Sequence, residues 1–302
     1  MIVLAVSGGC DSVGLFHGLL SLAETTDATA EEGSGRFFLS LGYARGGGAE
    51  EDRSASSSSL SPSVLCEVHV AHFDHRQRGT DSDADRTFVE GLCRDAGVPF
   101  HCFFWNDGGG DDEHDGDGDG DEEAKGAADR QKFSQETARD WRRSELVRLL
   151  DVLTTVSPPE RSEGWGRQRR QRLPGAIFTA HHRDDSDETM MLKLLRGSHI
   201  TNLSGMDVVR VHRAPSGSHD NGSKTPPSAL FARPLLCVTK EDIVTYLRRG
   251  GWTWREDASN TSGKYLRNRV RNELLPLMSD LVGGRNVLRV RISRKIEAGI
   301  FR

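Results

Sequence analysis

The feature that most constrains the fold is a short apolar run at the start of the chain that ends at a pair of glycines. Residues 2–6 read Ile-Val-Leu-Ala-Val, and residues 7–12 read Ser-Gly-Gly-Cys-Asp-Ser. An amphipathic run over residues 13–22 follows. An apolar run rich in β-branched residues and bounded by glycine predicts a buried strand, and the amphipathic run predicts a helix. The chain therefore begins with a strand, a tight turn and a helix.

The turn at residues 7–12 has two physical interpretations. A glycine-rich turn before a helix presents unpaired backbone N–H groups and the positive end of the helix dipole, and both attract phosphate oxygens. The hydroxyls of Ser7 and Ser12 add donors, and Asp11 suits a metal ion that accompanies the phosphates. The alternative is an ordinary strand-to-helix turn in which Asp11 or Ser12 is the N-cap. The spacing alone leaves both interpretations open.

Further strands and helices alternate along the chain. Because parallel strands need a crossover connection, this rhythm predicts an α/β fold with a parallel twisted sheet, helices on both faces and a short helical C-terminal extension. The strand that contains Pro234 is expected at a sheet edge, since proline cannot donate to a ladder. The apolar patterns predict strands over residues 64–73, 98–105, 175–180 and 230–236, and helices over residues 82–96, 133–150, 190–195, 239–249 and 263–281.

Polar segments divide the chain. We expect a domain over residues 1–210 with low-complexity insertions at 24–63 and 107–130, a polar insertion over residues 211–229, and the end of the domain with a basic helical extension over residues 230–302. The net charge of −5 is uneven, because residues 107–123 hold ten acids and no Lys or Arg. Residues 264–302 hold ten Lys or Arg and three acids. This basic end favours a nucleic-acid partner, with a solvated charged face as the alternative.

The cysteines indicate the compartment. Cys10, Cys66, Cys93, Cys102 and Cys237 form no C-x-x-C pair. This pattern indicates reduced thiols rather than a disulfide frame or a zinc–sulfur site. The sequence shows neither an apolar run of membrane length nor a signal peptide, so we expect a soluble intracellular protein without a membrane partner. It would be cytoplasmic in a bacterium, or lie in a plastid or mitochondrion in a eukaryote. A chain without an organelle leader is also what a fragment of a longer protein would show.

Three polar features follow predicted strands. They are residues 7–12, the pair Asp74-His75, and the segment His181-His182-Arg183-Asp184-Asp185-Ser186-Asp187-Glu188-Thr189. Ligands of open parallel sheets bind outside the carboxyl ends of the strands, so these features are expected at one site. Carboxylates there suit Mg²⁺, which prefers oxygen ligands. The alternative for the third segment is that Asp184 or Asp185 caps a helix while a histidine packs locally.

Several motifs together resemble one enzyme family. Ser7-Gly8-Gly9-x-Asp11-Ser12 resembles the pyrophosphate-binding loop of the N-type ATP pyrophosphatases, the PP-loop superfamily. The remaining motifs resemble, in order, those of the tRNA(Ile)-lysidine synthases within it. They are Ala71-His72-x-x-His75-x-x-Arg78-Gly79, Glu136-x-Ala138-Arg139-x-x-Arg142, Thr179 to Thr189, Leu194 to Ser198, Leu203-x-Gly205-Met206, Arg233-Pro234-Leu235-Leu236, Trp254-x-x-Asp257-x-Ser259-Asn260 and Tyr265-x-Arg267-Asn268-x-x-Arg271.

This resemblance implies an adenine nucleotide alpha hydrolase-like fold and a ligase that forms a carbon–nitrogen bond. The family joins free L-lysine to the wobble cytidine of tRNA(Ile) with a CAU anticodon, using ATP and Mg²⁺ and releasing AMP and pyrophosphate. The implied ATP-binding residues are Ser7, Gly8, Gly9, Cys10, Asp11, Ser12, His72 and His75. The implied catalytic residues are Asp11, Asp184, Asp185 and Arg139, with Asp11 and Asp185 as the metal ligands. The implied contacts to lysine or tRNA are Glu136, Arg139, His182, Glu188, Arg196, Arg267 and Arg271.

Departures from the family pattern keep alternatives open. Arg143, Ser186, Lys240 and Ser262 differ from the usual family residues, and the tRNA-binding domains that follow the catalytic domain in bacterial members are missing. A tRNA-thiolating PP-loop enzyme is one alternative, disfavoured because such enzymes commonly use cysteine pairs. A non-catalytic nucleotide- or tRNA-binding remnant is another. For each arginine, a surface ion pair worth at most about 1 kcal/mol is the alternative to an RNA contact. The oligomeric state stays open, with a homodimer among the possibilities.

Overall fold

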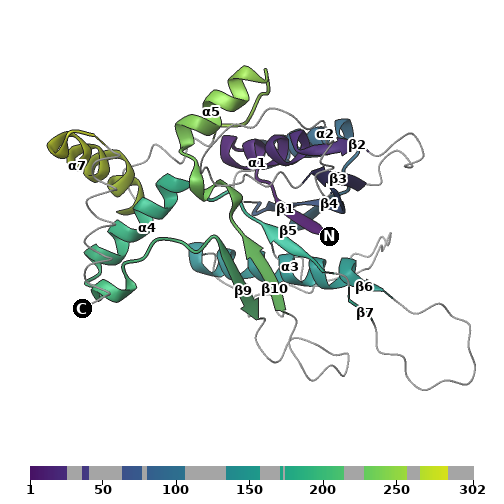
Figure 1. Cartoon of the computed structure of the whole chain (residues 1–302), viewed down its shortest axis with the longest axis horizontal. Helices are drawn as coiled ribbons and strands as arrows, with labels where there is room; N and C mark the ends of the chain where they lie inside the picture. Colours follow the sequence, from purple (N-terminus) through teal and green to yellow (C-terminus); the bar gives the residue numbers. More distant parts are fainter. Residues whose placement is uncertain are drawn as a thin grey trace, which may run out of the picture.

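The computed structural model describes residues 1–25, 36–40, 63–76, 80–105, 134–156, 171–172, 174–213, 228–256 and 266–284. The main strands are β1 (Ile2–Ala5), β4 (Ser63–Asp74), β5 (Phe100–Phe104), β8 (Ala176–Phe178), β9 (Val209–Arg213) and β10 (Ser228–Ala232). Neighbouring strands run parallel in the order β5–β4–β1–β8–β10, and β9 pairs antiparallel with β10. Figure 1 shows this sheet at the centre of the molecule.

Four of the described helices lie between the parallel strands along the chain: α1 (Cys10–Ser21), α2 (Thr80–Asp95), α3 (Gln135–Thr154) and α4 (Arg183–Leu195). Three more follow the last strand: α5 (Lys240–Arg249), α6 (Leu266–Arg269) and α7 (Leu275–Val282). Short 3-10 helices cover Ile200–Asn202 and Pro234–Cys237. The predicted α/β class with a mostly parallel sheet and a short helical C-terminal region is confirmed. In the part of the chain that the structure describes, no helix combines the length and the apolar character needed to cross a membrane.

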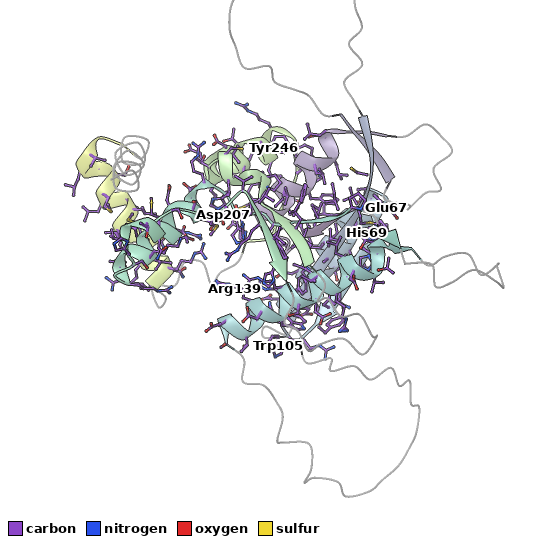
Figure 2. All side chains as sticks on the ribbon, turned by 60° about the horizontal axis from the view of Figure 1, so that its bottom comes forward. Glu67, His69, Trp105, Arg139, Asp207 and Tyr246 are labelled. Carbon is purple, nitrogen blue, oxygen red and sulfur yellow. The ribbon has the colours of Figure 1, made fainter. Side chains whose placement is uncertain are left out.

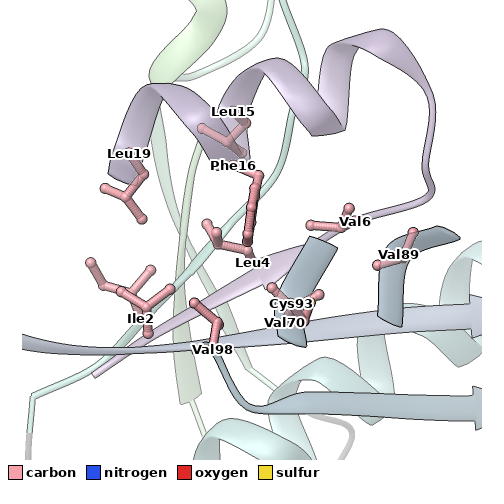
Figure 3. Close-up of a cluster of buried hydrophobic side chains, with 11 residues drawn as sticks. Ile2, Leu4, Val6, Leu15, Phe16, Leu19, Val70, Val89, Cys93 and Val98 are labelled. Carbon is pink, nitrogen blue, oxygen red and sulfur yellow. The ribbon is translucent and has the colours of Figure 1, made fainter. Parts of the chain in front are cut away.

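The sheet is covered on both faces, which explains why β1 and β8 are wholly apolar. On one face, Leu4 of β1 belongs to one apolar cluster with Phe16 of α1 and Val89 of α2, and Figure 3 shows Leu4 beside Phe16. On the other face, Val3 and Ile177 pack with leucines of α3. Each fully buried side chain of this size contributes about 1.5–3 kcal/mol to stability. These two layers hold the carboxyl ends of β1, β4 and β8 in fixed positions.

Two short strands fall at the start of and within the expected insertion 24–63. β2 (Ala23–Thr25) pairs with β3 (Arg36–Ser40), and β3 pairs with the first half of β4. The strand expected at 230–236 begins earlier and ends at Ala232, where Pro234 opens a 3-10 helix. That strand is not at an edge, since it lies between β8 and β9.

Other expectations fall outside the described residues. Strands β9 and β10 occupy both ends of the expected insertion 211–229, and residues 214–227 between them are not described. Residues 107–130 also lie outside the described residues, as do the motif parts at 77–79 and 257–265. β6 (Thr155–Val156) pairs with β7 (Gln171–Arg172), and residues 157–170 between these two strands are not described.

The C-terminal helical region packs against α4. Met191 of α4 is buried with Val270 and Leu275, as part of one apolar cluster. Between α6 and α7 the chain makes a π-helical turn over Val270–Leu274. Such widened turns inside helices occur frequently at functional sites. Arg271 lies within this turn and donates to Glu188 of α4.

The contact between α1 and α5 yields a prediction about two glycines in one helix. A Cβ at Gly14 would lie 2.5 Å from Cγ2 of Ile243, whereas a Cβ at Gly18 would meet nothing within 4 Å outside its own helix backbone. Gly14→Ala is therefore expected to destabilise the fold by about 1–3 kcal/mol through overpacking. Gly18→Ala is expected to stabilise it by about 0.5–1 kcal/mol through helix propensity. Urea unfolding of both variants measures the change in the free energy of unfolding. Changes of equal size and the same sign in the two variants would contradict the prediction.

Candidate active site

The loop over residues 7–12 has the geometry of an anion cradle. Gly8 has φ of +91°, which favours glycine, and Gly9 is the N-cap of α1. The Ser7 backbone N–H donates to Ser12 Oγ (3.2 Å), and Ser12 Oγ donates to the Gly9 carbonyl (3.0 Å). No side chain of the described residues caps α1, so the alternative in which Asp11 or Ser12 is the N-cap is wrong. The first N–H groups of α1 therefore face outward for a ligand.

A segment far along the chain fixes this loop from the other side. The Arg255 backbone N–H donates to the Gly8 carbonyl (2.9 Å), and Arg255 Nε donates to Asp85 Oδ1 of α2 (2.7 Å). We did not predict a role for Arg255 from the sequence, although it lies beside Trp254 in one of the family motifs. Its contacts hold the loop between α2 and the end of α5.

The end of β4 supports the loop rather than opening onto it. His72 is buried, and its Nδ1 donates to the Val6 carbonyl (2.9 Å), which joins the ends of β4 and β1. Asp74 Oδ1 accepts from the Arg76 backbone N–H (2.7 Å). His75 lies against Trp141 of α3, with ring centroids 5.4 Å apart. The ATP-binding roles of His72 and His75 stay predictions, and His72 at least also holds the sheet together.

His182 is the point where the loop and the third motif meet. Its side chain is 1% exposed, and its Nε2 lies 3.6 Å from Asp11 Oδ1 and 3.4 Å from Asp185 Oδ2. Its Nδ1 lies 3.7 Å from Asp184 Oδ2. Neither ring nitrogen has a hydrogen-bond partner among the described residues. Buried polar atoms are normally satisfied, so these nitrogens mark a place where a bound group completes the site.

Each carboxylate at this centre has a distinct environment. Asp184 Oδ2 accepts the Lys240 backbone N–H at the start of α5 (2.9 Å), and Asp185 Oδ2 accepts the His182 backbone N–H (3.1 Å). Asp11 is 32% exposed, and its Oδ2 lies 3.7 Å from Lys240 Nζ. Lys240 is a second residue that sequence reasoning did not place at the site. Asp11 is the carboxylate most accessible to a ligand.

The donor set fits Mg²⁺ better than a metal held by protein alone. Among the described residues, no group of three or more His, Cys, Asp or Glu side chains is arranged as a complete metal site. Mg²⁺ is usually held by one or two carboxylates and completed by substrate phosphates and water. Asp11 beside the anion cradle supplies the first carboxylate, and Asp185 lies across His182 from it. The metal roles of both residues stay predictions.

Two arginines pair with Glu188, whose side chain is completely buried. Arg267 Nε donates to Glu188 Oε2 (2.8 Å), and Arg271 Nη2 donates to the same oxygen (3.1 Å). Arg267 Nη2 also donates to Asp185 Oδ1 (2.9 Å). The sequence left open whether these arginines contact RNA or form ion pairs. In the structure they form ion pairs that are partly buried. Here the arginines neutralise α4 carboxylates, and their predicted contacts to tRNA stay predictions.

The remaining predicted residues lie on α3 and at the end of α4. Glu136 and Arg139 are exposed in the first turns of α3, which begins after a Ser134–Thr137 capping box. Arg139 is among the charges that help lower the pKa of His181 to about 4, although burial is the main cause. Arg139 therefore lies near His181, and Figure 2 shows it near the start of α3. Arg196 is exposed at the C-terminal end of α4, about 18 Å along the helix from Asp184.

Buried histidines give the fold a dependence on pH. Burial, aided by Arg142, lowers the pKa of His75 to about 4. Burial also lowers the pKa of His69 and of His101. An unfolded histidine binds a proton near pH 6.5. Between about pH 6.5 and 4 the unfolded state therefore holds more protons than the folded state, and the stability of the fold decreases as the pH is lowered. His75 alone is expected to contribute at most about 1.4 kcal/mol per pH unit.

Urea unfolding between about pH 7.5 and 4.5 measures this effect. His75→Phe keeps an aromatic ring against Trp141 and cannot titrate. It should reduce the loss of stability on acidification, whereas an unchanged slope would show that His75 is not responsible.

The sequence of this chain is similar to those of known proteins. The PP-loop domain family matches residues 170–278. The tRNA(Ile)-lysidine synthase of Porphyromonas gingivalis is 30% identical over 216 residues, covering 71% of this chain and 36% of that protein. The tRNA(Ile)-lysidine synthase of Symbiobacterium thermophilum is 28% identical over 282 residues, covering 93% of this chain and 40% of that protein. The tRNA(Ile)-lysidine synthase of Chlorobaculum tepidum is 27% identical over 282 residues, covering 92% of this chain and 57% of that protein.

A solved structure supports the fold. The U34-tRNA thiolase NcsA from Methanococcus maripaludis, with its 4Fe–4S cluster, superimposes with a TM-score of 0.51 at 12% identity, covering 98% of this chain and 72% of that chain. At this identity the likeness concerns the fold alone. This chain spans 36% to 57% of the length of the three lysidine synthases above. The chain therefore carries a PP-loop domain and is a sequence relative of the tRNA(Ile)-lysidine synthases.

Proposed function

We propose that this chain is an ATP-dependent ligase that joins free L-lysine to the wobble cytidine of tRNA(Ile) with a CAU anticodon. The observation that carries the proposal is the meeting of the phosphate-type loop with Asp11, His182 and Asp185 at one centre. The cytidine carbonyl oxygen attacks the α-phosphorus of ATP and pyrophosphate leaves. The lysine ε-amine then attacks the adenylated carbon, and AMP leaves. The relatives' names and the order of the motifs support this choice of substrates.

Different residues of the site bind the pyrophosphate and the metal ion. Backbone N–H groups at the start of α1, with the Ser7 and Ser12 hydroxyls, hold the pyrophosphate oxygens. Asp11 and Asp185 hold Mg²⁺, which when bound neutralises charge that develops on the phosphates. Lys240, beside Asp11, adds a positive charge at the same place. Such fixed charges act where the transition state becomes most negative.

The other side of the site faces the acceptor. Glu136 and Arg139 at the start of α3 are exposed and so are accessible to lysine or to the base. Glu188 with its two arginines positions Asp185 rather than contacting substrate, because Glu188 is fully buried. The target base must leave its stack to react, which an anticodon loop permits more easily than a duplex.

A thiolating PP-loop enzyme remains the second candidate because its fold is shared. The five cysteines do not favour it. Cys10 and Cys93 are buried at α1 and α2, while Cys237 is exposed beyond β10. Spread in this way, they do not supply a cluster of thiolates for a sulfur carrier or an iron–sulfur centre.

The test is pyrophosphate release from ATP with Mg²⁺ and unmodified tRNA(Ile), with and without labelled lysine. Label in the tRNA, dependent on ATP, would establish the ligase. Release that ignores lysine and requires a sulfur donor would favour the thiolating enzyme. Nucleotide binding without pyrophosphate release would favour a binding remnant. A tRNA with a different anticodon is the control for the substrate.

A further inference from the structure

Three arginines from separate elements share one side of the sheet, beside the candidate active site. Arg210 of β9 is in register with Phe231 of β10, so both side chains project from the same face. Phe231 packs in the apolar cluster with α3, which places Arg210 on the α3 side. Arg143 lies on α3, and Arg233 follows the end of β10.

Arg233 is held by neutral groups. Its backbone N–H donates to the Val208 carbonyl (2.8 Å), and its Nη1 donates to the Asp207 carbonyl (2.8 Å). Its Nε is buried and has no hydrogen-bond partner among the described residues. Burial lowers the pKa of Arg233, the Asp207 carboxylate raises it, and Arg210 and Arg143 lower it further. The charged groups around the Arg233 guanidinium are therefore one carboxylate and two further arginines.

The contrast with the arginines on α6 and the π-helical turn is informative. Arg267 and Arg271 have carboxylates of Asp185 and Glu188 within hydrogen-bond distance. Arg143 forms an exposed ion pair with Asp140 on the preceding turn of its own helix, with Nη1 and Oδ1 3.5 Å apart. An exposed pair of this kind contributes at most about 1 kcal/mol. A partly buried cation without a strong anionic partner is unfavourable unless a ligand supplies the negative charge.

The cluster adjoins the site through His181. Arg233 and Arg139 both lie close enough to His181 to lower its pKa. In Figure 2, the labelled Arg139 on α3 and Asp207 ahead of β9 lie at the same end of the sheet, with nitrogen-tipped side chains between them. An anion bound there would lie next to the carboxyl ends of β8 and β10.

We propose that Arg143, Arg210 and Arg233 form a binding site for the phosphate backbone of RNA, beside the reacting base. A nucleic-acid backbone fits better than the carboxylate of free lysine, because its successive phosphates offer several negative charges to three guanidinium groups, whereas a carboxylate offers one. Arg210 is also exposed on the outer strand of the described sheet, where a long ligand can pass. The inference rests on the proposed function for the identity of the RNA as tRNA.

The test is equilibrium binding of fluorescently labelled tRNA(Ile) to the whole chain at several KCl concentrations. Removing one arginine–phosphate interaction should make the slope of log K against log salt shallower by about 0.7–0.9. Arg210→Gln and Arg143→Gln are each expected to weaken binding by roughly 5–10-fold at about 0.1 M salt. Arg148→Gln is the matched control, because Arg148 is an exposed arginine further along α3.

Arg233 also holds the backbone at Asp207, so its variants need a check on folding. Arg233→Lys keeps the charge and should retain most of the salt dependence, whereas Arg233→Gln should not. If the Arg143 and Arg210 variants keep the wild-type slope, as Arg148→Gln should, the proposal is overturned. It is also overturned if the wild-type chain binds no RNA. If the variants alter the salt slope but the chain transfers no lysine, the phosphate site is supported and the proposed function is rejected. If the chain transfers lysine but the variants keep the wild-type slope, the proposed function is supported and the phosphate site is rejected.

Discussion

Replacing Glu188 by Ala is expected to lower the free energy of unfolding by about 3–5 kcal/mol. Glu188 has no exposed surface, and its carboxylate accepts hydrogen bonds from Arg267 and from Arg271. Its removal would leave two guanidinium groups partly buried, with only Asp185 to neutralise them. It would also loosen the packing of α4 against the C-terminal helical region. The destabilisation should appear in urea unfolding as a shifted midpoint, read from circular dichroism.

A control lies in the same helical region. Arg269 and Glu273 form an exposed ion pair one helical turn apart, with Nη2 and Oε2 3.0 Å apart. Glu273→Ala is expected to change the free energy of unfolding little, because exposed pairs of this spacing are weak. Glu188→Gln should fall between the two, since it keeps the shape and removes the charge. Equal effects of Glu188→Ala and Glu273→Ala would show that the buried network does not hold the helices together.

Replacing Asp11 by Asn is expected to slow pyrophosphate release by roughly 100–1000-fold, or about 3–4 kcal/mol in the activation free energy. Asp11 is the most accessible carboxylate at the centre, 3.6 Å from His182 Nε2 and 3.7 Å from Lys240 Nζ. The amide keeps its shape but removes the charge that would hold Mg²⁺ beside the phosphates. The rate should be measured with saturating ATP over a series of Mg²⁺ concentrations.

Stability should separate this effect from misfolding. Asp11 is 32% exposed, and its carboxylate lies 3.6 Å from His182 and 3.7 Å from Lys240, which is longer than a hydrogen bond. Asp11→Asn should therefore change the unfolding free energy by less than about 1 kcal/mol. Asp83→Asn, at an exposed carboxylate of α2 that pairs with Arg86, is the control for the removal of one negative charge. Asp11 would have no catalytic role if its variant kept the wild-type rate at every Mg²⁺ concentration. A lower rate together with a loss of folding would assign it to structure.

How far a feature could be predicted from the sequence depends on the range of the interactions that form it. The strand at residues 2–5, the turn and α1 are visible in the sequence, because apolar periodicity and paired glycines act within a few residues. The convergence of residues 7–12 with the segment from His181 to Thr189 was also predictable, because both follow strands of one parallel sheet. The N-cap alternative failed at Gly9, since cap geometry depends on backbone angles that composition does not reveal.

Strand pairing at the margins of the sheet was not predictable from pattern. Strands β2, β3 and β9 lie within or beside polar segments, and their pairing depends on the neighbours that β4 and β10 offer. Strand preference is largely a matter of packing against such neighbours, so a polar composition does not exclude it. Pro234 illustrates the same limit, because it ends β10 at a 3-10 helix rather than marking an edge.

The sequence by itself therefore determined the α/β class, the phosphate-type loop and the carboxylates that follow the strands. Only the tertiary structure decided which of these groups are already paired. Arg267 and Glu188 are 79 residues apart in the chain, and Lys240 reaches Asp11 from the far end of the domain. The physical reason is that hydrogen bonds and ion pairs depend on distances of a few ångströms, which packing of the whole core fixes. Local periodicity identifies the elements, and their packing assigns each charged group its partner.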